Sequence, residues 1–84
     1  MNFKAEIDIM PLPALLDPQG KAVSSNMKNI GLEEITNVRI GKHITLYVDA
    51  TDTDQAEIKV TEACKKLLCN EIMEGFSFTL EYRV

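Results

Sequence analysis

Cysteine and histidine are scarce in this 84-residue chain, which limits the chemistry it can perform. Its two cysteines, Cys64 and Cys69, are five residues apart in a stretch predicted to be helical. On an α-helix they would point about 140° apart, with Cα atoms roughly 8 Å from each other, beyond disulfide reach. His43 is the only histidine, so a histidine-rich metal cluster is excluded. We therefore expect reduced cysteines that pack as small apolar residues in a cytoplasmic protein.

Long hydrophobic runs and positive charge are also lacking. No apolar stretch approaches the length of a membrane span, and no signal-peptide pattern opens the chain. The net charge of −4 argues against nucleic acid as a partner, because phosphate backbones bind to basic surfaces. The length favours a single domain over residues 1–84, with a modest core that would gain stability from association with other chains.

Two segments alternate apolar and polar residues, which is typical of half-buried β-strands. The apolar positions of the first are Phe3, Ala5, Ile7 and Ile9, and those of the last are Phe76, Phe78, Leu80 and Tyr82. Pro11 and Pro13 end the first strand, because proline cannot donate to a sheet ladder.

Helix signals follow the first strand. Asp17 is a good N-cap and Pro18 fits the first helical position, while Gly31 is suited to end the helix. The predicted buried stripe of this helix consists of Val23, Met27 and Ile30. A second helix is predicted to begin near Thr51-Asp52 and to bury Ala56, Val60, Ala63, Cys64 and Leu67.

Residues 35–50 lie between these helices and are predicted to form a β-hairpin. Its first arm carries Val38 and Ile40, and its second carries Ile44, Leu46 and Val48. A three-residue loop, Gly41-Lys42-His43, keeps both apolar sets on one face of the sheet, whereas a two-residue turn would not.

The resulting order βαββαβ predicts an α+β fold of the ferredoxin-like type. We expect a four-stranded antiparallel sheet, order 4-1-3-2, with both helices on one face. The opposite face is expected to lie open. It would carry Lys4, Glu6, Asp8, Arg39, Thr45, Tyr47, Asp49, Ser77, Thr79 and Glu81.

No constellation of residues in the sequence predicts catalysis. His43 falls at the predicted hairpin tip, where we expect an exposed loop histidine without a nucleophile beside it. Asp8 and Asp49 are candidates for neighbouring carboxylates on the open face, where they would be solvated. The acidic first strand also argues against an RNA-recognition sheet, which stacks bases on aromatic residues.

Three stretches resemble the PurS family, the small subunits of phosphoribosylformylglycinamidine synthase. Residues 16–23 read Leu-Asp-Pro-Gln-Gly-Lys-Ala-Val, where the family has Leu-Asp-Pro-Gln-Gly-x-Ala-Val. Residues 37–42 read Asn-Val-Arg-Ile-Gly-Lys and are similar to the family's Asp-Val-Arg-Ile/Val-Gly-Lys. Residues 64–74 resemble its Cys-Glu-Lys-Leu-Leu-Ala-Asn-x-Val-Ile-Glu segment, with Lys65 and Cys69 in place of the glutamate and the alanine. The resemblance covers nearly the whole chain.

This resemblance implies a non-catalytic subunit of an ATP-dependent amidoligase in purine biosynthesis. In that family, a glutaminase subunit releases ammonia from glutamine, and a synthetase subunit uses ATP and magnesium to install it on formylglycinamide ribonucleotide. PurS, as a dimer, bridges the two subunits and helps ammonia pass between them. The resemblance therefore implies no cofactor in this chain, with ATP and magnesium bound by the synthetase partner, and self-association as a dimer or tetramer.

The candidate interface residues lie in the first two stretches: Asp17, Gln19, Gly20, Arg39, Gly41 and Lys42. Asp17 and Gly41 also have purely structural explanations, as a cap and a turn residue. An alternative function is a dimeric ferredoxin-like module that senses a small ligand, and a small hydrolase that acts alone is a third.

Overall fold

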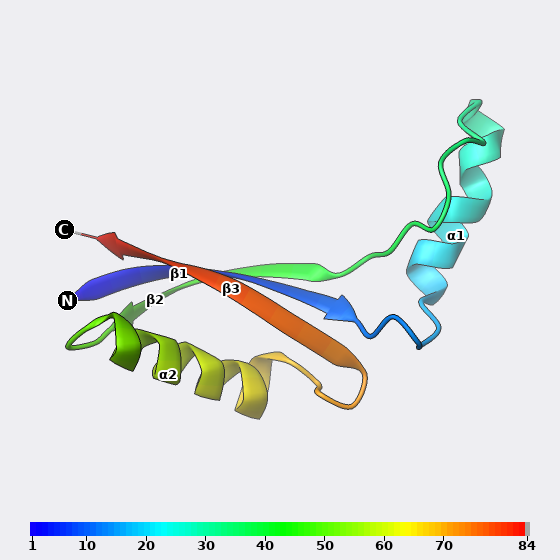
Figure 1. The fold of residues 1–84 in the computed structure, drawn as a ribbon. Helices are drawn as coiled ribbons and strands as arrows, with labels where there is room; N and C mark the ends of the chain where they lie inside the picture. Colours follow the sequence, from blue (N-terminus) through cyan, green and yellow to red (C-terminus); the bar gives the residue numbers. More distant parts are fainter. Residues whose placement is uncertain (84) are drawn as a thin grey trace.

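The computed structural model describes residues 1–83, which form a three-stranded sheet, one helix packed on that sheet, and a helical arm (Figure 1). The elements in chain order are β1 (Asn2–Pro11), α1 (Pro18–Asn26), η1 (Met27–Ile30), β2 (Lys42–Asp49), α2 (Thr53–Ala63), η2 (Cys64–Leu68) and β3 (Glu74–Arg83). All strand pairs are antiparallel, in the order β2-β1-β3.

The core lies between β1 and α2. Every apolar side chain of the alternating β1 pattern, from Phe3 to Ile9, is at most 2% exposed, as expected for the central strand. The buried residues Ala56 and Val60 of α2 and Cys64 of η2 pack against this face. Asp52 caps α2 by accepting a hydrogen bond from the Gln55 backbone N–H at 2.8 Å, close to the predicted start. None of the helices within residues 1–83 is long and apolar enough to cross a membrane.

The prediction of a four-stranded sheet, order 4-1-3-2, with two covering helices is wrong. The hairpin over residues 35–50 does not form, because residues 36–41 belong to no strand and Lys42 and His43 lie inside β2 instead of a turn. The backbone N–H of Ile40 is bonded to the Asp17 carboxylate rather than to a neighbouring strand. The segment before β2 therefore runs back beside α1 and does not add a strand (Figure 1).

The helix α1 does not cover the sheet. It stands away from the sheet at one end of the molecule, together with η1 and the segment that returns to β2 (Figure 1). Its predicted stripe is correspondingly not buried: Val23 is exposed, Ile30 is 67% exposed, and Gly20 is the only buried residue of α1. We call residues 17–41 the arm. The Cα radius of gyration is 16.5 Å, against about 12 Å for a compact domain of this length.

The end of α2 departs from α-helical geometry. Residues Cys64–Leu68 form a π-helical turn in which the Cys69 N–H donates to the Cys64 carbonyl at 2.9 Å. A π-turn inserts one residue relative to an α-helix, so the side chains that follow change face. The predicted core residue Leu67 is therefore 82% exposed, and Leu68 packs against the core instead.

Candidate partner-binding groove

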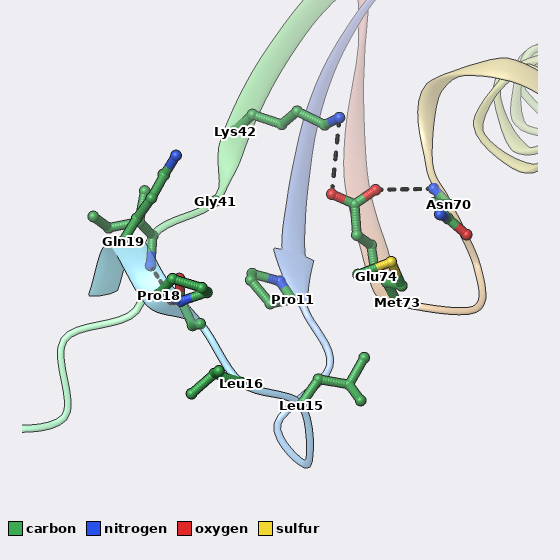
Figure 2. Close-up of a pocket in the computed structure, with 12 residues that line it drawn as sticks. Pro11, Leu15, Leu16, Pro18, Gln19, Gly41, Lys42, Asn70, Met73 and Glu74 are labelled. Atoms are coloured by element: carbon green, nitrogen blue, oxygen red, sulfur yellow. Dashed lines mark hydrogen bonds and ion pairs between the residues drawn. The ribbon is translucent and has the colours of Figure 1, made fainter. Parts of the chain in front are cut away.

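A groove lies at the root of the arm, where the end of β1 meets the start of α1 (Figure 2). One wall is the β1–α1 loop with the first turn of α1, and the other is the turn between α2 and β3. Between them lie Pro11 and the chain entering β2. The lining residues are Pro11, Leu15, Leu16, Asp17, Pro18, Gln19, Ile40, Gly41, Lys42, Asn70, Met73 and Glu74.

The Asp17 carboxylate holds the first wall together. It caps α1, as predicted, because its Oδ1 accepts from the Gly20 backbone N–H at 3.0 Å, and its Oδ2 accepts from the Ile40 N–H at 2.9 Å. These two backbone donors, first that of Ile40 and then that of Gly20, lower the pKa of Asp17 because they stabilise the ionised carboxylate. Asp17 therefore joins the first turn of α1 to the segment that leads into β2.

Arg39, in the segment between η1 and β2, also stabilises this contact between the arm and the sheet. Its guanidinium donates to the backbone carbonyls of Pro11 at 2.8 Å and Leu12 at 3.1 Å, and its Nε lies 3.6 Å from Asp17 Oδ2. These carbonyls lie at the end of β1, where Pro11 is the last residue of the strand and Leu12 follows it. The guanidinium thus connects the arm to the end of the sheet.

Gly20 and Gly41 are required by close backbone approach. A Cβ on Gly20 would lie closer than 3.0 Å to the Val38 carbonyl oxygen, and a Cβ on Gly41 would lie closer than 3.0 Å to that of Ile9. Both neighbours are backbone atoms and cannot move without breaking the junction. Neither glycine has a positive φ, so the constraint is contact and not backbone strain.

The second wall is built around Glu74 at the start of β3. Its Oε1 accepts from the Asn70 backbone N–H at 2.9 Å, and its Oε2 lies 3.8 Å from Lys42 Nζ (Figure 2). Leu16 is 73% exposed, and Leu15 and Met73 are also exposed. The groove thus offers apolar side chains beside one ion pair, a surface suited to an apolar anchor residue with polar neighbours.

Four of the six predicted interface residues, Asp17, Gln19, Gly41 and Lys42, line this groove. Gly20 is buried behind it, and Arg39 faces an adjoining depression along α1. Interface roles for all six remain predictions, although Asp17, Gly20, Arg39 and Gly41 have structural roles here. Sequence reasoning missed Leu15, Leu16, Asn70 and Glu74. The adjacent exposed leucines in a loop were the available signal.

His43 occupies a different position from the one predicted. It lies on β2 on the open face of the sheet, opposite Asp8, and not at a hairpin tip. The expected neighbours Asp8 and Asp49 are far apart in the register, since Asp49 pairs with Asn2.

The sequence matches the family model described as PurS, phosphoribosylformylglycinamidine (FGAM) synthase, over residues 4–82. The chain belongs to the PurS family. Its sequence is 33% identical to the FGAM synthase subunit PurS of Bacillus subtilis over 79 residues, which cover 94% of this chain and 93% of that protein. The Synechocystis PurS subunit is also 33% identical, over 94% of this chain and 79% of its own length.

Solved PurS structures have the same fold. The B. subtilis PurS structure superposes with a TM-score of 0.85 at 32% identity and covers 95% of this chain and 99% of its own. A chain of the PurLQS structure from Thermotoga maritima gives a TM-score of 0.88 at 27% identity, over 96% of this chain and 99% of its own. These matches cover nearly the whole of this chain, so the arm is part of the PurS fold. The curated relatives are named as subunits of FGAM synthase.

Proposed function

We propose that this chain is a non-catalytic subunit of FGAM synthase in de novo purine biosynthesis. It bridges the glutaminase and synthetase subunits in the cytoplasm and assists the transfer of ammonia between them. ATP and magnesium are bound by the synthetase partner, and this chain carries no cofactor. Membership of the PurS family and likeness to a chain of a PurLQS structure support this assignment.

The arm is the structural observation that supports it best. This 84-residue chain is elongated, with principal extents of 51 × 28 × 14 Å. Its amphipathic helix α1 therefore stands away from the core that β1 and α2 form. The exposed apolar stripe of α1 and the groove at its root are separate surfaces, and both are available to other chains. Separate contact surfaces are what a bridging subunit requires.

Self-association as a dimer or tetramer is part of the proposal. Ile44, Leu46 and Val48 on β2 are only partly buried, because α2 alone covers that face of the sheet. The unpartnered stripe of α1 and this partly covered strand are both apolar. The arm of a second copy would bury both, at about 25 cal/mol per Å² of apolar surface removed from water. A monomer at micromolar concentration in sedimentation equilibrium would contradict this part.

The decisive experiment compares two nitrogen sources. The glutaminase and synthetase subunits are mixed with and without this chain, and product formation is measured with glutamine and, separately, with ammonium chloride. We expect glutamine-dependent formation to require the chain and ammonia-dependent formation to be much less affected. Equal rates with and without the chain on both nitrogen sources would refute the proposal.

The groove can be tested within the same assay. Leu16→Lys places a charge on the apolar wall, and Leu67→Lys is a matched control, because Leu67 is similarly exposed but lies outside the groove. We expect glutamine-dependent activity to need a higher concentration of the Leu16→Lys chain than of the Leu67→Lys chain. Saturable binding of a metabolite by the isolated protein would instead favour the ligand-sensing alternative.

A further inference from the structure

The open face of the sheet contains a cluster of three titratable side chains that the proposed function does not use. His43 lies between two carboxylates of β1. Its Nδ1 is 2.7 Å from Asp8 Oδ1, and its Nε2 contacts Glu6 Oε2. Thr45 donates to the same Glu6 oxygen at 3.0 Å. We call Glu6, Asp8 and His43 the cross-strand cluster.

The geometry of this cluster depends on a proton. A neutral imidazole carries one N–H and one lone pair, so it can donate to only one of two carboxylates. An imidazolium carries two N–H groups and satisfies both. After loss of one proton, a lone pair would face either Asp8 or Glu6, and that contact would become repulsive. The observed arrangement is therefore the arrangement of the charged ring.

The two carboxylates that contact the ring favour the imidazolium, and the nearby lysines are paired with carboxylates of their own. On β1, Lys4 Nζ pairs with Glu6 Oε1 at 3.0 Å, and beyond β1, on β3, Ser77, Thr79 and Glu81 stand opposite Asp8, Glu6 and Lys4. The neighbouring β2 lysine, Lys42, pairs with Glu74. Asp8 first, and then Glu6, raise the pKa of His43, while His43, Lys4 and Thr45 lower the pKa of Glu6 to about 2. Both shifts have the direction that an ion pair requires.

The position of the cluster gives it a mechanical consequence. His43 is the second residue of β2, and the register between β1 and β2 ends one residue earlier, at the pair Ile9–Lys42. Immediately before this point come Gly41, which lies against Ile9, and Ile40, which is bonded to Asp17. The cluster therefore lies where the arm leaves the sheet.

We propose that protonated His43 is a pH-sensitive clamp that fastens the start of β2, and with it the root of the arm, to β1. A histidine whose pKa is higher in the folded protein than the ordinary value of about 6.5 stabilises the fold fully below that value. The stabilisation is lost as the pH rises through the folded pKa. The clamp is thus closed below the ordinary pKa of histidine and opens as the pH rises through the folded pKa of His43, and this property does not depend on any partner subunit.

The single histidine makes the proposal directly measurable. The His43 Hε1 resonance is followed by NMR from pH 5 to pH 10 in the wild type and in Glu6→Gln, Asp8→Asn and Glu81→Gln chains. We expect the pKa of His43 to exceed 6.5 in the wild type and to fall in the first two variants. Glu81→Gln is the matched control, since that carboxylate shares the open face but lies opposite Lys4, and it should leave the pKa nearly unchanged.

Hydrogen exchange then tests the clamp itself. Protection factors of the backbone amides of residues 42–45, corrected for intrinsic exchange, are measured across the same pH range. We expect partial loss of protection as the pH passes through the measured pKa of His43, and no such loss in His43→Gln. A His43 pKa at or below 6.5, or protection at residues 42–45 that is the same on both sides of the titration, would overturn the proposal.

Discussion

Replacement of Gly41 by alanine tests the junction between the arm and the sheet. The new Cβ would lie closer than 3.0 Å to the Ile9 carbonyl oxygen and to the Met10 sulfur. The sulfur can swing away, but the carbonyl belongs to the central strand and cannot. Overpacking of this kind costs about 1–3 kcal/mol. Because about 1 kcal/mol shifts the Tm of a domain this small by roughly 4–8 °C, Gly41→Ala should melt at least about 4 °C below the wild type.

Gly75 provides a matched control in the neighbouring strand. It pairs with Met10 from β3, its φ is not positive, and a Cβ there would lie 3.7 Å from Leu12 Cδ2, an ordinary contact. Gly75→Ala should therefore be neutral, or more stable by about 0.4–1 kcal/mol, because alanine restricts the unfolded chain. Both variants are compared by urea and thermal unfolding at one protein concentration, since self-association would change the apparent stability. If Gly41→Ala proved as stable as Gly75→Ala, the close approach described here would be wrong.

Three further predictions concern the core, the open face and the arm. Val60→Ala removes two methyl groups from a residue that is 1% exposed, so it should lower the free energy of unfolding by about 2–3 kcal/mol in urea titrations; a loss below 0.5 kcal/mol would contradict the packing of α2. The pKa of Glu6 is lowered to about 2, so Glu6 stabilises the fold above its ordinary value near 4.5, and this contribution is lost as the pH falls toward 2. The wild type should therefore lose more Tm than Glu6→Gln between pH 5 and pH 2, and parallel losses would refute the ion pairing. Asp17→Asn would turn an amide N–H₂ toward one of two backbone donors, so amide exchange at Gly20 or Ile40 should accelerate while the β1 amides stay protected; unchanged exchange at both would remove Asp17 from the junction.

The elements with local signals were predictable from the sequence. Alternation identified β1 and β3, and the caps at Asp17 and Asp52 and the αL glycine at Gly31 marked helix boundaries that the structure confirms. Each of these features is determined by a few neighbouring residues. Side-chain capping and strand periodicity act over short distances, so they can be recognised without knowledge of the tertiary structure.

The arm could not be predicted in this way. The stripe of Val23, Met27 and Ile30 has the same pattern whether its helix packs on its own sheet or on another chain. Gly41 indicated a turn, but the structure uses it for close contact with Ile9, and residues 36–41 are held by Asp17 and Arg39 instead of a strand. Likewise, no periodicity in the sequence predicts the π-turn, which places Leu68 instead of Leu67 against the core.

The candidate site was predicted in part. Asp17, Gln19, Gly41 and Lys42 come together in the groove although they belong to two separate sequence stretches. The second wall, with Asn70 and Glu74, was missed, because the turn before β3 approaches the arm root only through the antiparallel pairing of β1 with β3.

The bridging role is tested most directly by the composition of the assembled complex. The glutaminase and synthetase subunits are mixed in the presence of glutamine, with and without this chain, and their masses are followed by sedimentation velocity. We expect one species that contains all three proteins when the chain is present, and separate catalytic subunits when it is absent. Association of the two catalytic subunits to the same extent without this chain would contradict the account.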